Sequence, residues 1–220
     1  MKLWILLTLP LLSSLASAAT LATSTLTDSG SDVTTYNTWK GQSFTLGADA
    51  LAGNIVSVTL KLEVVTSNSN LAVFIVAKVP GSGVPDLAQK FARLDQTSTL
   101  SGTLPQPVTF TLNSVASVTA IEPGDTYWLV LAVTAPDLEE NNSSGLIRWH
   151  YAATQGQDPG AEPGWSVGTR VAESGTEGLN WSDSVQTPYL FEMTAVMVPE
   201  PATASLALPT VLLAFRRRRK

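Results

Sequence analysis

The chain has one histidine and no cysteine, and this limits the chemistry that its side chains could perform. A Ser-His-Asp or Cys-His arrangement would need His150 as its base, yet no G-x-S-x-G or comparable nucleophile motif accompanies this residue. The single imidazole also excludes a zinc site built on histidines. Because His150 stands between Trp149 and Tyr151 in a predicted strand, we expect it to have a structural or surface role.

Carboxylates are numerous enough to supply the acid and the base of a glycosidase. Most of them lie in predicted turns, where solvation explains them without a catalytic function. The loop of residues 137–142 also offers oxygen ligands to calcium, but it lacks the spaced acidic pattern of an EF-hand, so we favour an ordinary solvated loop. We expect no enzyme activity, no metal and no cofactor. The carboxylates considered are Glu122, Asp125, Asp137, Glu139, Glu140, Glu173 and Glu177, of which Asp137, Glu139 and Glu140 belong to the calcium alternative.

Four aromatic residues in the C-terminal half could instead stack on sugar rings. Exposed tryptophan faces serve this purpose in β-sandwich binding modules. The residues are Trp149, Tyr151, Trp165 and Trp181, and the last two lie in a Gly-rich stretch that favours them for the site. Packing in the core is the competing explanation. A module that binds exopolysaccharide or host glycan is therefore our alternative to a structural or adhesive function.

The elements that must position these residues are predicted to be β-strands. Residues 56–64 place an apolar side chain at every second position, as a half-buried strand requires. Residues 71–79 are apolar on both faces, which predicts a central strand paired with its predecessor as a hairpin. The other predicted strands are 42–46, as a short opening strand, 108–112, 126–134, 145–151 and 187–196.

Helix is predicted to be scarce. The best candidate is one or two turns within residues 86–94, after Pro85, and residues 154–183 predict a long loop or a loose hairpin. Seven or more short strands of this kind predict an all-β fold, namely an antiparallel two-sheet β-sandwich that is jelly-roll-like. We expect it to form one domain over residues 19–198.

The first 18 residues have the pattern of a cleavable signal peptide. Met1 and Lys2 precede an apolar run over residues 3–15, and Ala16-Ser17-Ala18 predicts cleavage before Ala19. The run is shorter than the roughly 20 apolar residues of a permanent span. We therefore expect export by the Sec machinery and a mature chain that begins at Ala19.

The body of the chain is acidic. Without the six basic residues at the two ends, 7 of the 13 Lys and Arg residues remain against 18 Asp and Glu residues, a net charge of −11. A nucleic-acid partner would need a basic surface, so we exclude nucleic acid.

Residues 199–220 have three parts in a fixed order. Pro199, Glu200 and Pro201 precede an apolar segment over residues 202–215, and the basic end follows: Arg216, Arg217, Arg218, Arg219 and Lys220. This order resembles the PEP-CTERM sorting signal of Gram-negative bacteria that make extracellular polysaccharide. The resemblance implies processing near Pro-Glu-Pro by a membrane peptidase, an exosortase. The chain would then be a substrate of that enzyme, transiently associated with the inner membrane and delivered to the cell surface or the extracellular matrix.

The body resembles a second family, the choice-of-anchor domains, in particular type R. The residues that carry this likeness are Gln42-Ser43-Phe44-Thr45, the strand 57–62, Gly83-Val84-Pro85 and the strand 126–131. These motifs are structural, so the resemblance implies a fold and a location at the surface and names no reaction. Taken together, the sequence predicts an exported structural or adhesive protein.

Overall fold

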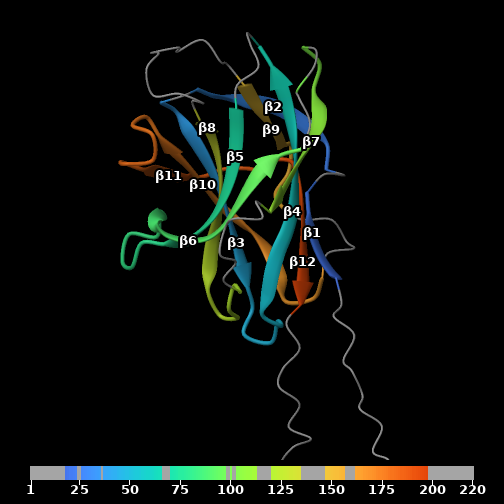
Figure 1. Cartoon of the computed structure of the whole chain (residues 1–220), viewed down its shortest axis with the longest axis vertical. Coiled ribbons are helices and arrows are strands. Elements are labelled where there is room, and N and C mark those ends of the chain that lie inside the picture. The colour runs from blue at the N-terminus through green and yellow to red at the C-terminus, as the bar shows by residue number, and fades with distance from the viewer. Residues whose placement is uncertain are drawn as a thin grey trace, which may run out of the picture.

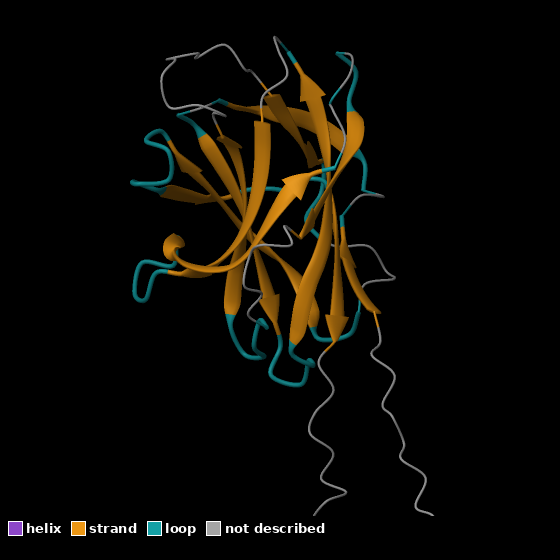
Figure 2. Cartoon of the chain, in the orientation of Figure 1, coloured by secondary structure: helices purple, strands orange, loops and turns teal. Residues whose placement is uncertain are grey.

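The computed structural model contains twelve strands and no helix among the residues that it describes (Figures 1 and 2). The described residues are 18–23, 26–35, 37–65, 70–97, 100, 103–112, 120–134, 147–156 and 162–197. The strands are β1 (Ala18–Ala22), β2 (Asp28–Thr34), β3 (Trp39–Leu46), β4 (Gly53–Val64), β5 (Asn70–Lys78), β6 (Pro85–Gln96), β7 (Gln106–Leu112), β8 (Thr126–Thr134), β9 (Ile147–Ala152), β10 (Trp165–Ser174), β11 (Ser182–Val185) and β12 (Phe191–Met197). The prediction of an all-β fold is confirmed.

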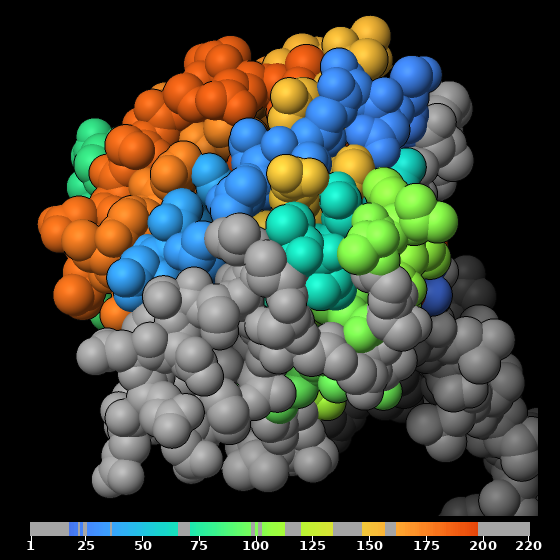
Figure 3. Space-filling model, turned by 90° about the horizontal axis from the view of Figure 1, so that it is seen from above, coloured from blue at the N-terminus to red at the C-terminus, as the bar shows by residue number. Residues whose placement is uncertain are grey.

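The strands form one curled antiparallel sheet. Its order is β1-β12-β4-β7-β6-β5-β8-β3-β10-β11, and β9 pairs with both β4 and β2 beside this path. The curl brings β1 close to the segment that leads into β10. There the backbone N–H of Glu162 donates to the carbonyl of Thr20 at 2.8 Å. Figure 3 shows residues of β2 and β9, in blue and yellow, next to one another on the upper surface.

The main core fills the inside of the curl. In β4, Val58, Leu60 and Leu62 are fully buried whereas the residues between them are partly exposed, which confirms the predicted alternation. In the last segment, Tyr189, Phe191, Met193 and Ala195 are buried on one face, again as predicted. Burial of alternate side chains in this way fixes the register of each strand, since a slip by one residue would turn its apolar set toward water.

A second, smaller core lies on the outer face of β5, β8 and β10. Phe74, Val76, Trp128 and Ala172 belong to it, and it explains why β5 is apolar on both faces. The predicted hairpin between β4 and β5 is wrong, however, because β5 pairs with β6 and β8. The strand β8 is itself buried over residues 127–133, so it matches the two-faced burial of β5, which the half-exposed β4 does not.

The predicted helix within residues 86–94 is also wrong, because these residues belong to β6. The pairing of β6 with β5 shifts between Ala77↔Asp86 and Val76↔Lys90, so three residues bulge from the ladder. The Asp86 carboxylate accepts the backbone N–H of Ala88 at 2.9 Å, which satisfies a donor that the bulge removes from the ladder. A local turn within a strand thus produced the helix-like signal.

Two further predictions are corrected in their bounds. The short opening strand 42–46 is longer, because β3 starts at Trp39, and it is the third strand of the chain. Of the two alternatives for residues 154–183, the hairpin is the one observed over part of this range: β10 and β11 pair antiparallel from Arg170↔Val185 to Glu173↔Ser182.

Thr23 joins the first strand to the last. It is fully buried, its backbone N–H donates to the carbonyl of Phe191 at 2.8 Å, and its hydroxyl donates to the carbonyl of Tyr189 at 2.6 Å. The same hydroxyl accepts the backbone N–H of Phe191 at 3.0 Å. A buried hydroxyl with these partners holds the end of β1 against the start of β12.

We predict that Thr23→Val lowers the free energy of unfolding by about 1–3 kcal/mol, because the isosteric side chain leaves buried polar groups unpaired. Urea unfolding measures the effect. The matched control is Thr109→Val, whose hydroxyl pairs with Thr59 on the partly exposed outer face and should cost less than about 0.5 kcal/mol. Equal effects of the two substitutions would contradict the role given to Thr23.

Candidate functional site

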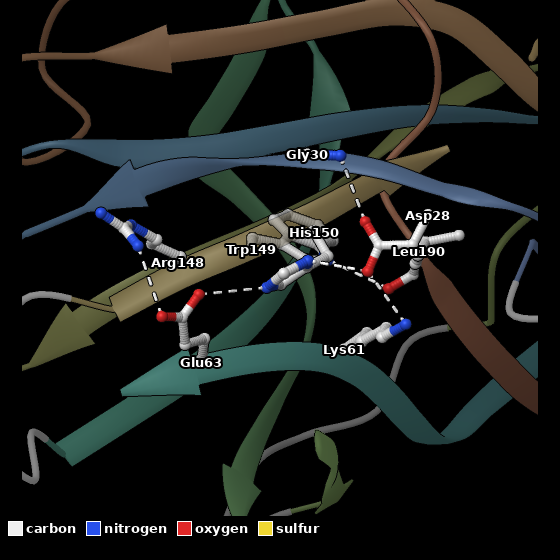
Figure 4. Close-up of polar contacts among 8 residues, drawn as sticks. All are labelled: Asp28, Gly30, Lys61, Glu63, Arg148, Trp149, His150 and Leu190. Carbon is white, nitrogen blue, oxygen red and sulfur yellow. Dashed lines mark hydrogen bonds and ion pairs between the residues drawn. The ribbon is translucent and has the colours of Figure 1, made fainter. Parts of the chain in front are cut away.

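The most concentrated group of charged side chains in the described structure surrounds His150 (Figure 4). We call Asp28, Lys61, Glu63, Arg148 and His150 the His150 cluster. The imidazole is 7% exposed, with Nδ1 2.9 Å from Asp28 Oδ2 and Nε2 3.4 Å from Glu63 Oε2. Neither ring nitrogen forms a well-directed hydrogen bond, so these contacts are defined by distance alone and are ion pairs only when the imidazole is protonated. The predicted strand around His150 is confirmed as β9.

Two cations complete the His150 cluster. Lys61 Nζ lies 2.9 Å from Asp28 Oδ2, and Arg148 Nη1 lies 3.3 Å from Glu63 Oε1. The other oxygen of Asp28 accepts the backbone N–H of Gly30 at 3.2 Å. Because the residues come from β2, β4 and β9, the cluster ties β2 and β9 to the main sheet.

The charges within the cluster decide what it can do chemically. Each of the two carboxylates already faces a cation, and no group of three metal-binding side chains occurs among the described residues. Among the described residues, neither nitrogen of His150 hydrogen-bonds to a serine or threonine hydroxyl. His150 is therefore not paired with a hydroxyl nucleophile there. The geometry is that of a structural ion-pair network.

Tyr189 contacts both strands of the β2–β9 pair. Its hydroxyl donates to Asp32 Oδ2 at 2.7 Å, and its ring stacks on Trp149 with centroids 4.2 Å apart. Burial, followed by the nearby Asp32 carboxylate, raises the pKa of Tyr189. The phenol therefore stays protonated and acts as a donor at neutral pH.

The pKa of Asp28 is lower than the ordinary 3.8 of an aspartate. Burial, the largest single influence, raises it, but the close contacts of the carboxylate with Lys61 and His150 and its electrostatic attraction to them together outweigh burial. Since the folded-state pKa is depressed, the unfolded chain binds more protons between the two values. The stabilisation by Asp28 is therefore present at neutral pH and is lost as the pH falls through the lowered value.

We predict that Asp28→Asn destabilises the protein at pH 7 and that the difference from wild type shrinks as the pH falls through the lowered pKa of Asp28, because the wild-type carboxyl is then protonated as well. Urea unfolding between pH 2.5 and 7 measures both curves. Asp49→Asn, at an exposed position, is the control and should cost less at pH 7. A difference for Asp28→Asn that persists unchanged to the lowest pH would show that its charge is unimportant.

Trp165 and Trp181, the residues favoured for the alternative of a sugar platform, lie on different faces of the sheet. Trp165 is 3% exposed and stacks on Phe44 inside the main core, with centroids 6.4 Å apart, and Trp149 is fully buried. Tyr151 is only partly buried. The Gly-rich surroundings suggested an exposed loop, but β10 begins at Trp165, and the first side chain of that strand points inward.

Trp181 instead lies on the outer face, partly buried against the second core together with Trp39 and Leu87. The ring of Trp39 stacks on Phe74 with centroids 6.1 Å apart. Gly178 also lies against Trp39, so closely that a Cβ atom on Gly178 would be 3.0 Å from the Trp39 ring. These aromatic side chains thus pack against one another within the domain.

Two cations lie near the ring of Phe74 in the second core. Lys90 Nζ lies 5.2 Å from the centroid of Phe74, and Arg93 lies 5.8 Å from it. Such contacts attract a cation to the ring face. The sequence analysis missed Trp39, Phe74 and these cations. Trp39 lies in β3, which β8 separates from β5 in the sheet, and the pairing of β5 with β6 was not predicted.

Of the described carboxylates considered for catalysis, one forms an ion pair with a lysine and the others lie in turns. Glu173 pairs with Lys40 at 2.6 Å, Glu122 and Asp125 are exposed in the turn before β8, and Glu177 lies in the turn after β10. Asp137, Glu139 and Glu140 lie outside the described residues, as do Ala16, the Pro-Glu-Pro motif and the basic end. The structure therefore brings no two of the described catalytic candidates into contact as a carboxylate pair.

The two ends of the domain lie side by side. Ala18 is the Cα partner of Val196 and Ala19 is the partner of Ala195, so the start of β1 adjoins the end of β12. Figure 1 shows both ends at the lower end of the molecule. Ala18, which adjoins the predicted cleavage position, and Met197, the last residue of β12, thus lie at the same end of the fold.

No family model and no curated protein matches the chain. The described residues include no helix that could cross a membrane.

Proposed function

We propose that this is an exported structural or adhesive protein of the surface or extracellular matrix of a Gram-negative bacterium. Its residues 199–220 would be the sorting tail, read by an exosortase-type peptidase after export by the Sec machinery. One observation carries the proposal. The described strands run from Ala18 to Met197, and these two residues lie together at one end of the sheet.

The positions of the charges support the same arrangement. Lys2 precedes the first apolar segment and the basic end follows the second, so both charged ends favour the cytoplasmic side. Each segment would then leave the membrane at its outer surface. A domain whose two ends are adjacent can follow both segments without any linker.

We also propose that the curled sheet is a two-layer, jelly-roll-like sandwich. The main core is shared by β12, β4 and β7 on one side and by β5, β8 and β3 on the other, as expected for two packed layers. A structural or adhesive role agrees with this arrangement, since the described aromatic and charged clusters serve packing. Extracellular polysaccharide stays a proposed partner.

We predict that deletion of residues 199–220 leaves a folded domain that no longer reaches the cell surface. The last strand ends at Met197, so far-UV circular dichroism and the thermal unfolding midpoint should match those of the full chain. Surface delivery is measured by protease accessibility on intact cells. Normal delivery of the truncated chain would count against the sorting role.

The matched variant keeps the apolar and basic segments and changes only the motif, as Pro199→Ala with Pro201→Ala. We expect it to accumulate in the inner membrane with its tail intact. Mass spectrometry of the exported wild-type protein should lack Arg216 to Lys220, and recovery of that basic end would contradict processing.

A further inference from the structure

The predicted signal-cleavage bond, between Ala18 and Ala19, lies inside β1. We propose that this bond can be cut only before β1 closes onto β12, so that removal of the signal and folding of β1 compete. The inference rests on the proposed function, because it takes the signal peptide from there. It adds that the folded domain protects its own processing site.

The ladder between β1 and β12 occupies the backbone on both sides of the bond. Ala18 pairs with Val196 and Ala19 with Ala195, and the pairing continues to Ala22↔Glu192. A peptidase binds its substrate as an extended segment through backbone groups and side-chain pockets. In the folded protein β12 already occupies one of the two backbone edges of this segment.

Burial adds a second barrier to cleavage. Ala19 is 1% exposed and Leu21 is fully buried, so both side chains belong to the main core. On the side of β1 away from β12, the carbonyl of Thr20 accepts the N–H of Glu162. To expose the bond, at least Ala19 must leave the core, and the neighbouring contacts of Thr20 and Leu21 resist that opening.

The order of synthesis gives the peptidase its opportunity. The described ladder partner of β1 is β12, which is the last strand of the domain to be made. Until residues 191–197 have crossed the membrane, β1 lacks the strand that forms its ladder, and the bond is open. A chain that closes first would keep its signal, and it would stay attached to the membrane even after its tail is cut.

A disulfide lock tests this competition. Thr20 and Thr194 are Cα partners on the outer face, and the chain has no cysteine, so Thr20→Cys with Thr194→Cys can form one defined bond. Full-length precursor, purified with its signal and folded, is treated with purified signal peptidase in detergent. We expect the oxidised double variant to be cut more slowly than wild type, and reduction to restore the wild-type rate.

A second variant opens β1 instead. Leu21→Ala removes a buried side chain of the strand and should raise the cleavage rate about tenfold or more, whereas Leu179→Ala, the same substitution at an exposed position, should leave it unchanged. Equal cleavage of the oxidised, reduced and Leu21→Ala proteins would overturn the inference. Failure of urea-unfolded precursor to be cut between Ala18 and Ala19 would instead contradict the signal peptide, and with it the proposed function.

Discussion

The pairing of β12 with both β1 and β4 is the interaction on which the rest of the structure depends. This strand carries Phe191, Met193 and Ala195 into the main core and holds the first strand of the chain at its outer edge. Its position brings residues from the two ends of the sequence into contact. Pairing between segments so far apart in the chain costs loop-closure entropy, and folds rich in such contacts tend to form slowly. The adjacency of the domain ends follows directly from it.

The charged side chains on the outer face of β2, β4 and β9 play a different part. Two carboxylates and two cations surround His150 in a nearly neutral group, although the body of the chain is strongly acidic. The strand β2 pairs, among the described strands, with β9. Its attachment therefore depends on side chains as well as on the backbone ladder, through Asp28 to Lys61 and Asp32 to Tyr189.

The strands with clear apolar alternation could be predicted from the sequence, as in β4 and β12, whereas their order in the sheet could not. The pairing of β5 with β8 follows from burial on two faces, which a local pattern does not reveal. β2 has the sequence Asp-Ser-Gly-Ser-Asp at its start, without any apolar alternation, so neither the strand nor Asp28 was predicted. For the same reason the partners of His150 could not be named. Trp165 was misplaced because its glycine-rich neighbours resemble a loop.

The end of β12 sets a limit on any enzyme that processes the tail. Met197 is buried and paired with Gly53, and Pro199 follows two residues later, at most about 7 Å along an extended chain. An active site that reaches this motif must therefore tolerate a folded body almost in contact with it. If the tail is processed as proposed, the peptidase needs clearance for a bulky neighbour rather than a deep substrate tunnel.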